Sequence, residues 1–211
     1  MGGRQCIGTS GHARELGDIA CDLGYRVIYV ARDQSELEIW DFPGEVMLES
    51  VVGEHRNIGF AIGIGENAAR QKVARRFADT LNFVNLIHPN ATFGKRQREV
   101  INARQGVAVC AGVSFTNNIL VGDFVVFNRN ATIGHDVIVD DFVNVAPGAC
   151  ISGNVHLGAR CWIGTGAVVN QGTPDAKLLI GADTIIGSGS VVIKTCEPNA
   201  TYVGIPAKRI K

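Results

Sequence analysis

The sequence of 211 residues lacks the features of several protein classes. Its formal net charge at pH 7 is zero, so no bulk electrostatic attraction to nucleic acid or to an anionic membrane is expected. No apolar run approaches the roughly 20 residues that a membrane-spanning helix needs. The N-terminal stretch does not show the pattern of a secretory signal. We therefore expect a cytoplasmic protein with no nucleic-acid partner and no transmembrane segment.

The six cysteines do not have the paired spacing of a zinc site. Cys6 and Cys161 fall at apolar positions of the local patterns, which indicates reduced thiols packed as small hydrophobic side chains. We therefore expect no metal ligands and no disulfide framework.

What the sequence does contain is a strict period of six. Every sixth residue is apolar along the series Val109, Phe115, Val121, Phe127, Ile133, Val139, Val145, Ile151, Leu157, Ile163 and Val169. The residue four positions after each stop is smaller or slimmer, as at Val113 and Ala131. Helices of period 3.6 and strands of period 2 do not produce this pattern. It is typical of a parallel β-helix, in which three hexapeptides form one coil and residues eighteen apart stack about 4.8 Å apart.

The period is interrupted at 171–179 and resumes at Ile180. We expect the interruption to form an external loop at one corner. The segment 91–106 is a transition whose basic residues, between Lys95 and Arg104, are also expected to form a loop.

The first 88 residues follow a different pattern. A short strand at 5–8 leads through Gly8-Thr9-Ser10-Gly11-His12 into a helix, and a second strand covers 26–30. Further strands are expected at 58–62 and 82–87, with a helix at 68–80 whose Arg70, Lys72, Arg75 and Arg76 form a solvated face. The acidic region 31–57 has no clear pattern. We place the domain boundary at residue 88, between an α/β unit (1–88) and the β-helix (89–211).

The strand–turn–helix–strand order resembles a Rossmann-type nucleotide-binding half, where backbone N–H groups at the helix start face a phosphate. The full three-glycine fingerprint is absent. A tight turn that needs glycine only for its dihedrals is therefore an equal alternative.

Within the coils, His135 and Asp136 stand out, because His135 is the third residue of its hexapeptide and faces outward. A neutral imidazole held by a carboxylate can act as a general base near pH 7. The two side chains need not touch, and an ordinary surface pair is the alternative interpretation. Gly153 lies one coil further on, where its N–H could donate to an oxyanion. Asn128 could contact an acceptor group, and His156 is expected at a solvated corner.

Several segments together resemble one family. They are Gly8-Thr9-Ser10-Gly11-His12, Asn85-Leu86-Ile87-His88-Pro89, the coils with His135-Asp136, and Val203-Gly204-Ile205-Pro206-Ala207-Lys208. Over essentially its whole length the chain is similar to the sugar O- and N-acyltransferases of the sialic acid O-acetyltransferase type. It looks most like bacterial enzymes that acetylate UDP-linked 4-amino-4,6-dideoxy sugars, such as the UDP-N-acetylbacillosamine pathway enzyme. The expected fold is an N-terminal α/β Rossmann-like unit followed by a left-handed parallel β-helix of hexapeptide repeats.

The resemblance implies a homotrimer with acetyl-CoA bound along the coils between adjacent subunits. His135 would be the general base that deprotonates the sugar's 4-amino group, and Asp136 would orient it. Asn128 would contact the acceptor, and the Gly153 N–H would donate to the thioester oxygen. The expected UDP-sugar contacts are Gly8, Ser10, Gly11, His12, Asp33, Gly65 and Asn67. The expected CoA contacts are Gly153, Gly187, Val203, Ile205 and Lys208.

The chain departs from the family pattern at two places. Asn144 stands where many relatives have a second histidine, and Ala31-Arg32-Asp33 replaces an acidic pair, so that Asp33 is the nearest candidate for the uridine. Because no cysteine is placed beside a base, we expect direct transfer in a ternary complex without an acyl-enzyme. The alternatives are O-acetyl transfer to a sialic acid or another sugar hydroxyl, and a non-catalytic trimer that binds a nucleotide.

Overall fold

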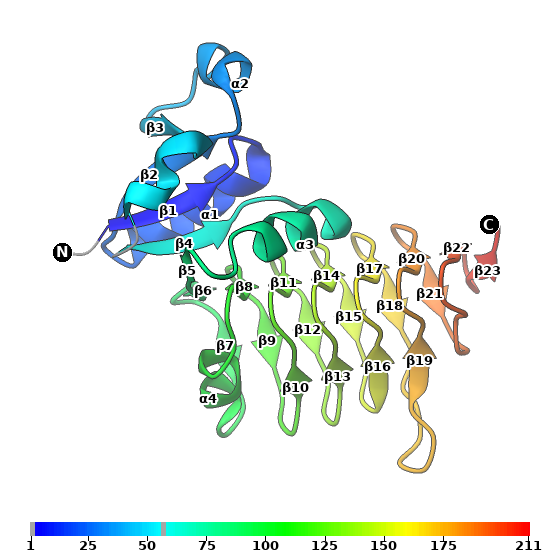
Figure 1. The fold of residues 1–211 in the computed structure, drawn as a ribbon. Helices are drawn as coiled ribbons and strands as arrows, with labels where there is room; N and C mark the ends of the chain where they lie inside the picture. Colours follow the sequence, from blue (N-terminus) through cyan, green and yellow to red (C-terminus); the bar gives the residue numbers. More distant parts are fainter. Residues whose placement is uncertain (1–2, 56–57) are drawn as a thin grey trace.

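The computed structural model describes residues 3–55 and 58–211. An N-terminal α/β unit sits at one end of a prism of short strands, and one of its helices, α3, extends along the prism (Figure 1). The last two residues of the irregular region 31–57 lie outside the described part. No helix of the described part is long and apolar enough to cross a membrane.

The N-terminal unit is built on a five-stranded parallel sheet with the order β3-β2-β1-β4-β5. Its strands are β1 (Gly3–Ile7), β2 (Arg26–Ala31), β3 (Glu45–Leu48), β4 (Gly59–Ile62) and β5 (Asn82–Phe83). Its helices are α1 (Gly11–Asp22), α2 (Gln34–Glu38), the 3₁₀ helix η1 (Glu49–His55) and α3 (Asn67–Arg76). Helix α1 buries Ala13, Leu16, Ile19 and Ala20 on one face, the amphipathic pattern that packs a helix against a core. The predicted Rossmann-like order is confirmed.

The rest of the chain forms a parallel β-helix with three faces. The first face contains β6 (Leu86–Ile87), β8 (Ala108–Val109), β11 (Val126–Phe127), β14 (Asn144–Val145), β17 (Trp162–Ile163), β20 (Ile185–Ile186), β22 (Thr201–Val203) and β23 (Lys208–Arg209). The second face contains β7 (Thr92–Phe93), β9 (Ser114–Phe115), β12 (Thr132–Ile133), β15 (Cys150–Ile151), β18 (Val168–Val169) and β21 (Val191–Val192). The third face contains β10 (Leu120–Val121), β13 (Ile138–Val139), β16 (Val155–Leu157) and β19 (Leu178–Ile180).

The strand register confirms that residues eighteen apart stack. Phe127 pairs with Val145, and Ile133 pairs with Ile151. The apolar stops point inward, and Phe127, Val145 and Ile163 are all 0 % exposed. The sixfold period therefore builds one continuous apolar column along the axis of the prism.

From Gly106 to Gly166, each corner of the prism is turned by a residue with left-handed backbone geometry. These residues recur at intervals of six as Gly106, Gly112, Asn118, Phe124, Asn130, Asp136, Phe142, Gly148, Asn154, Arg160 and Gly166. Glycine, asparagine and aspartate reach this region most readily. We call the edge between the first and second faces corner A, that between the second and third faces corner B, and that between the third and first faces corner C. Phe124, Phe142 and Arg160, which lack this preference, all lie on corner C.

Helix α3 lies against corner C and binds its carbonyl oxygens. Arg70 is 1 % exposed, and it donates from Nε to the carbonyl of Phe124 (3.0 Å) and from Nη2 to that of Phe142 (2.8 Å). Asn67 donates to the carbonyl of Arg160 at 2.8 Å. Desolvation of the guanidinium by burial lowers the pKa of Arg70 to about 10. The expectation of a solvated face is therefore wrong for Arg70, whose planar donors replace water at these carbonyls.

Four other local expectations are corrected. The strand at 82–87 is two strands in different sheets, because Asn85 between them binds the carbonyl of Ile101 and the N–H of Val107. The basic segment near 95–104 contains helix α4 (Gln97–Asn102), which is anchored by hydrogen bonds between the buried side chain of Gln97 and the backbone of Ile119.

The helix expected to reach residue 80 ends at Arg76, and His156 lies inside β16 instead of at a corner. The boundary at residue 88 stays a prediction, and sheet membership changes between β5 and β6.

The contacts of Arg70 lead to a prediction about stability. Arg70→Met should lower the free energy of unfolding by about 3 kcal/mol or more, because several buried carbonyls lose their donors at about 1–3 kcal/mol each. Urea unfolding measures the loss, with Arg75→Met, on the exposed side of the same helix, as the control. Equal stability of the two variants would contradict the role assigned to Arg70.

Candidate active site

His135 and Asp136 form a hydrogen-bonded pair on corner B. His135 Nδ1 lies 2.7 Å from Asp136 Oδ2, so the two adjacent side chains do touch. Asn118, eighteen residues earlier, donates to the other carboxylate oxygen. The hydrogen bonds from His135 and then Asn118 hold the pKa of the Asp136 carboxyl below its ordinary value. An ionised carboxylate at Nδ1 favours the tautomer that leaves the Nε2 lone pair free to accept a proton.

Gly153 lies directly beside this imidazole. A Cβ added to Gly153 would be 2.5 Å from His135 Nε2, so only glycine lets the ring occupy its place. The Gly153 carbonyl accepts from Gly172 at 3.0 Å, whereas its N–H has no acceptor among residues 3–55 and 58–211. The predicted stacking of Gly153 on His135 thus leaves a free backbone donor next to a free imidazole edge.

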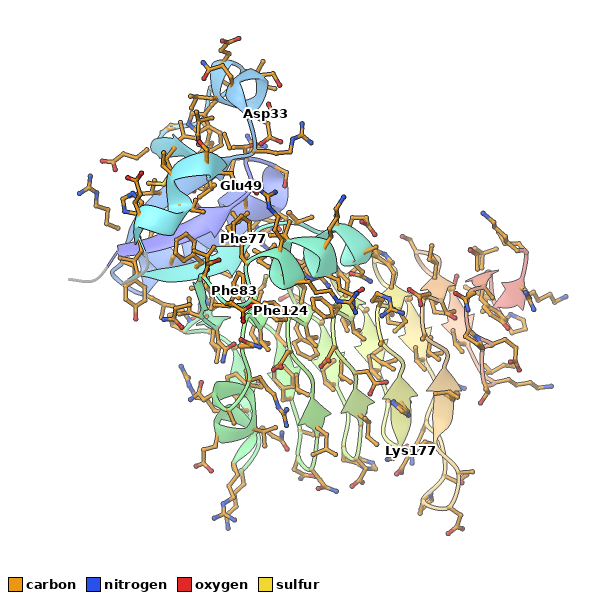
Figure 2. The ribbon with its side chains drawn as sticks, in the orientation of Figure 1. Asp33, Glu49, Phe77, Phe83, Phe124 and Lys177 are labelled. Atoms are coloured by element: carbon orange, nitrogen blue, oxygen red, sulfur yellow. The ribbon has the colours of Figure 1, made fainter. Side chains whose placement is uncertain are left out.

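The insertion after the coil of Gly153 folds back on this pair. The Lys177 ammonium, labelled in Figure 2, donates to the Asp136 carbonyl, and the N–H of Leu178 donates to the carbonyl of Asn154 (3.0 Å). The segment is a loop, as expected, and it also places a cation at corner B. No periodic signal in the sequence indicated this contact.

A cavity of about 730 Å³ lies at the carboxyl ends of the sheet strands, beside α3. It is lined by Ile7, Gly8, Thr9, Ser10, Val30, Arg32, Glu36, Ile39, Glu49, Ile64, Gly65, Glu66, Lys72, Val73 and Arg76. Three of the expected substrate contacts, Gly8, Ser10 and Gly65, therefore line one cavity. Ligands of open parallel sheets bind at this edge.

Two chain turns meet at the floor of the cavity. Gly8 has a φ of 117°, and a Cβ there would be 3.1 Å from the carbonyl oxygen of Gly63. The Ser10 hydroxyl, at the N-cap of α1, donates to the same carbonyl at 3.2 Å. The glycine of the first turn is therefore needed both for its dihedrals and for close approach to the second turn.

Asp33 and Asn67 do not line this cavity. Asp33 caps α2, and hydrogen bonds from Ser35, from Arg32 and from the Glu36 N–H hold the pKa of its carboxyl well below its ordinary value. The Asn67 side chain is fully occupied, because it donates to corner C and accepts from Arg70. Asn67 therefore joins the two units. Near Asp33, the residues that line the cavity are Arg32 and Glu36.

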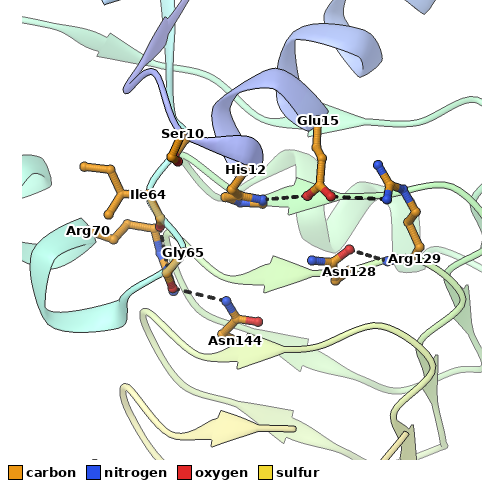
Figure 3. A network of polar contacts seen from close by, with 10 residues as sticks. Ser10, His12, Glu15, Ile64, Gly65, Arg70, Asn128, Arg129 and Asn144 are labelled. Carbon is orange, nitrogen blue, oxygen red and sulfur yellow. Dashed lines mark hydrogen bonds and ion pairs between the residues drawn. The ribbon is translucent and has the colours of Figure 1, made fainter. Parts of the chain in front are cut away.

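Corner A carries a polar network beneath the first turn of α1 (Figure 3). His12 Nδ1 is 3.1 Å from Glu15 Oε2, and Glu15 Oε1 is 3.2 Å from Arg129 Nη1. The hydrogen bond to His12 and the charge of Arg129 hold the pKa of the Glu15 carboxyl below its ordinary value, against the opposing effect of burial. Asn128 lies next to Arg129 and accepts from its N–H at 2.7 Å.

Two polar atoms at this network have no partner within the described chain. They are His12 Nε2 and Asn144 Oδ1, both buried, and the other end of Asn144 donates to the carbonyl of Gly65 at 3.2 Å. A buried polar atom without a hydrogen bond is costly unless a ligand or water supplies one. Gly11 and His12 do not line the cavity, whereas Asn144 is linked to its lining by the hydrogen bond to Gly65.

The expected CoA contacts near the C-terminus also come together. A Cβ on Gly187 would be 2.7 Å from Val203, and Val203 pairs with Lys208 across the antiparallel strands β22 and β23. Ile205, in the turn between them, is 76 % exposed. Gly187 follows β20 on corner A, the corner that also carries Asn128.

Within one chain, however, the expected site residues lie on two corners. His135, Asp136 and Gly153 are on corner B, whereas Asn128 and Gly187 are on corner A. The second face separates the corners by one hexapeptide side, on the order of 20 Å at about 3.3 Å per residue. No hydrogen bond or ion pair in the described structure connects the two groups.

Known proteins resemble this chain over both of its units. The PglD N-terminal domain family matches residues 6–77. GDP-perosamine N-acetyltransferase from Escherichia coli O157:H7 is 32% identical over 153 residues, which cover 72% of this chain and 67% of that protein. PerB from Caulobacter crescentus, solved with CoA and GDP-perosamine, has a TM-score of 0.85 and 29% identity over 100% of this chain and 98% of that chain. The acetyltransferase domain of PglB from Neisseria gonorrhoeae FA1090, solved with acetyl coenzyme A, has a TM-score of 0.83 and 26% identity over 98% of each chain.

The chain belongs to the bacterial hexapeptide-repeat sugar acyltransferases. This confirms the predicted family and its combination of a Rossmann-like unit with a parallel β-helix. Four of the six cysteines, Cys6, Cys110, Cys161 and Cys196, are buried. Burial raises the pKa of Cys6 and Cys110 to about 12 and that of Cys196 to about 11, and it raises the pKa of Cys161 further. Thiols in such surroundings are poor nucleophiles.

Several residues of the candidate site were not predicted from the sequence. Asn118 obeys the same interval of eighteen that located Gly153, so the repeat could have identified it. Glu15 lies three residues after the predicted contact His12 on a helix, a spacing that brings side chains together. Arg129 and Lys177 carry no such signal, because their partners are set by how distant segments pack.

The Glu15 bridge gives a pH-dependent prediction. Its folded-state pKa is below the ordinary 4.5, so it contributes stability above the unfolded-state pKa and loses it as the pH falls through the folded-state pKa. Glu15→Gln should cost about 1 kcal/mol near pH 7, and the difference from wild type should shrink below pH 4.5. Urea unfolding across this range measures it, with Asp18→Asn on the same helix as control. A difference that does not change with pH would contradict the bridge.

Proposed function

We propose that this acyltransferase is a sugar N-acetyltransferase that moves the acetyl group of acetyl-CoA to the 4-amino group of a nucleotide-linked 4-amino-4,6-dideoxy sugar. The observation that carries the proposal is the His135–Asp136 pair beside the free N–H of Gly153. The named relatives, which act on or bind GDP-perosamine, CoA or acetyl coenzyme A, support it. The resemblance in sequence implies UDP, so the proposal covers both nucleoside diphosphates.

The proposed reaction needs only a base, an oxyanion donor and correct positioning. The sugar amine attacks the thioester carbonyl carbon while His135 Nε2 takes its proton, and the carbonyl oxygen becomes an oxyanion that accepts from the Gly153 N–H. The C–S bond then breaks, and the proton passes from His135 to the leaving thiolate of CoA. Asp136 stabilises the imidazolium during these steps. No acyl-enzyme is required.

The active site would lie between two copies of the chain. The N-terminal unit supplies the cavity. Corner A supplies Asn128 and the C-terminal group of Gly187, Val203 and Lys208. Corner B supplies His135 and Gly153. A second copy whose corner B faces corner A of the first would complete the site, as the predicted homotrimer does.

The function is tested first by thiol release from acetyl-CoA with a panel of acceptors. The panel contains UDP- and GDP-linked 4-amino-4,6-dideoxy sugars and a free sialic acid, and one of the nucleotide-linked amino sugars should be acetylated. His135→Ala should lower kcat by about 10²- to 10⁴-fold, the usual contribution of a general base, whereas His156→Ala should not. Turnover with the sialic acid alone would indicate O-acetyl transfer. An unchanged rate in His135→Ala would overturn the assigned base.

Complementation between two inactive variants tests the shared site. A Cβ on Gly65 meets no atom within 4 Å, so Gly65→Leu should fold and fill the cavity. Co-expression of this variant with His135→Ala under two tags should restore roughly a quarter of the wild-type rate, since in a random trimer one site in three of each mixed assembly is intact. His135→Ala mixed with His135→Asn is the control. Doubly tagged assemblies without activity would place the whole site in one chain.

A further inference from the structure

The cavity of the N-terminal unit contains a buried carboxylate that the proposed chemistry does not use. Glu49 is 8 % exposed and begins η1, directly after β3. Its Oε1 lies 2.7 Å from Nη1 of Arg76, on the last turn of α3. Both side chains line the cavity, and Figure 2 labels Glu49 in the N-terminal unit. A carboxylate is withdrawn from water only at a cost, and this ion pair uses one of its two oxygens.

The distance from the turn after β1 to Glu49 matches the distance from the phosphates of a nucleotide to its base. In the sheet order, β3 lies two strands from β1, which is about 10 Å at the usual strand spacing. Phosphates at the start of α1, near Gly8 and Ser10, would therefore leave the base close to the end of β3. The lining also includes Val30, on the intervening strand β2, and Ile39, after α2. Both are apolar side chains that can contact the faces of a planar ring.

We propose that Glu49, held by Arg76, is a specificity-determining residue that selects guanine over uracil in the nucleotide of the sugar substrate. This inference rests on the proposed function and names the base at that same site. Guanine presents two adjacent donors, N1–H and N2–H, beside the acceptor O6. A carboxylate accepts from both donors, and the neighbouring Arg76 has donors for O6.

Uracil fits the same pair less well. It presents one donor, N3–H, between two carbonyl oxygens, so only one carboxylate oxygen gains a hydrogen bond. The other would face a carbonyl oxygen, and an acceptor opposite an acceptor is repulsive. Discrimination of this kind, which penalises the wrong ligand as well as rewarding the right one, is the usual basis of specificity. The inference therefore favours GDP over the UDP that the sequence resemblance implies.

The other carboxylates of the lining are less suited to reading the base. The Glu36 carboxylate accepts from the backbone N–H of Arg32 at 2.7 Å, and Glu66 caps α3 through the N–H groups of Ala68 and Ala69. Both carboxylates thus have backbone donors in their own segments. Glu49 is distinguished by its burial and by a partner from another helix.

Calorimetric titration of GDP and of UDP into the full-length protein tests the inference without acetyl transfer. Wild type should bind GDP at least about 10-fold more tightly than UDP. Glu49→Gln should weaken GDP binding by about 10- to 100-fold and change UDP binding little. Glu54→Gln, an exposed carboxylate of the same η1, should change neither.

Each outcome decides the inference. Equal or tighter binding of UDP by wild type, binding of neither nucleotide, or a parallel loss of both in Glu49→Gln would overturn it. If Glu49→Gln fails to fold, the wild-type ratio of the two affinities still decides. Tight GDP binding with no thiol release from any acceptor would refute the proposed function and leave the base selection intact.

Discussion

The placement of the N-terminal unit against the coils depends on the buried guanidinium of Arg70. It binds carbonyls of corner C, where Phe124 and Phe142 hold left-handed geometry without the usual side chains for it. The same group also donates to the carbonyls of Ile64 and Gly65 (3.1 and 2.9 Å), which border the cavity. One side chain therefore fixes a cavity wall against the coils. Because its partners are buried acceptors, substitution would leave several carbonyls unsatisfied at once.

The three corners of the β-helix carry different groups of residues. Corner C carries the α/β unit, corner A carries Asn128 and the C-terminal group, and corner B carries His135 and its partners. Stacking at one strand spacing lets neighbouring coils support a functional residue, as Asn118 and Gly153 do for the His135–Asp136 pair. The same rigidity keeps corners A and B apart in one chain, which is why the proposed site combines corners from two copies.

Much of this arrangement could be predicted, and the reasons differ by element. The period of six located the coils, the inward residues and the position of Gly153 beside His135, because each depends on local repetition. Helix α4 was mistaken for a loop, since its anchor, Gln97, binds the backbone of a later coil. Arg70 was placed in solvent for a related reason. Its charge pattern is that of a solvated helix, and only its distant carbonyl partners make burial favourable.

Local sequence patterns were enough to specify the coil geometry, the strand–turn–helix start and the residue types available for catalysis, because backbone sterics and side-chain periodicity act over a few residues. Tertiary structure alone decided which polar groups meet. It brought Lys177 to the carbonyl of Asp136, Glu15 to Arg129 and Glu49 to Arg76, pairs that are far apart in the chain. Such pairs form where separate segments pack together and exclude water, and no local sequence pattern indicates which segments those are.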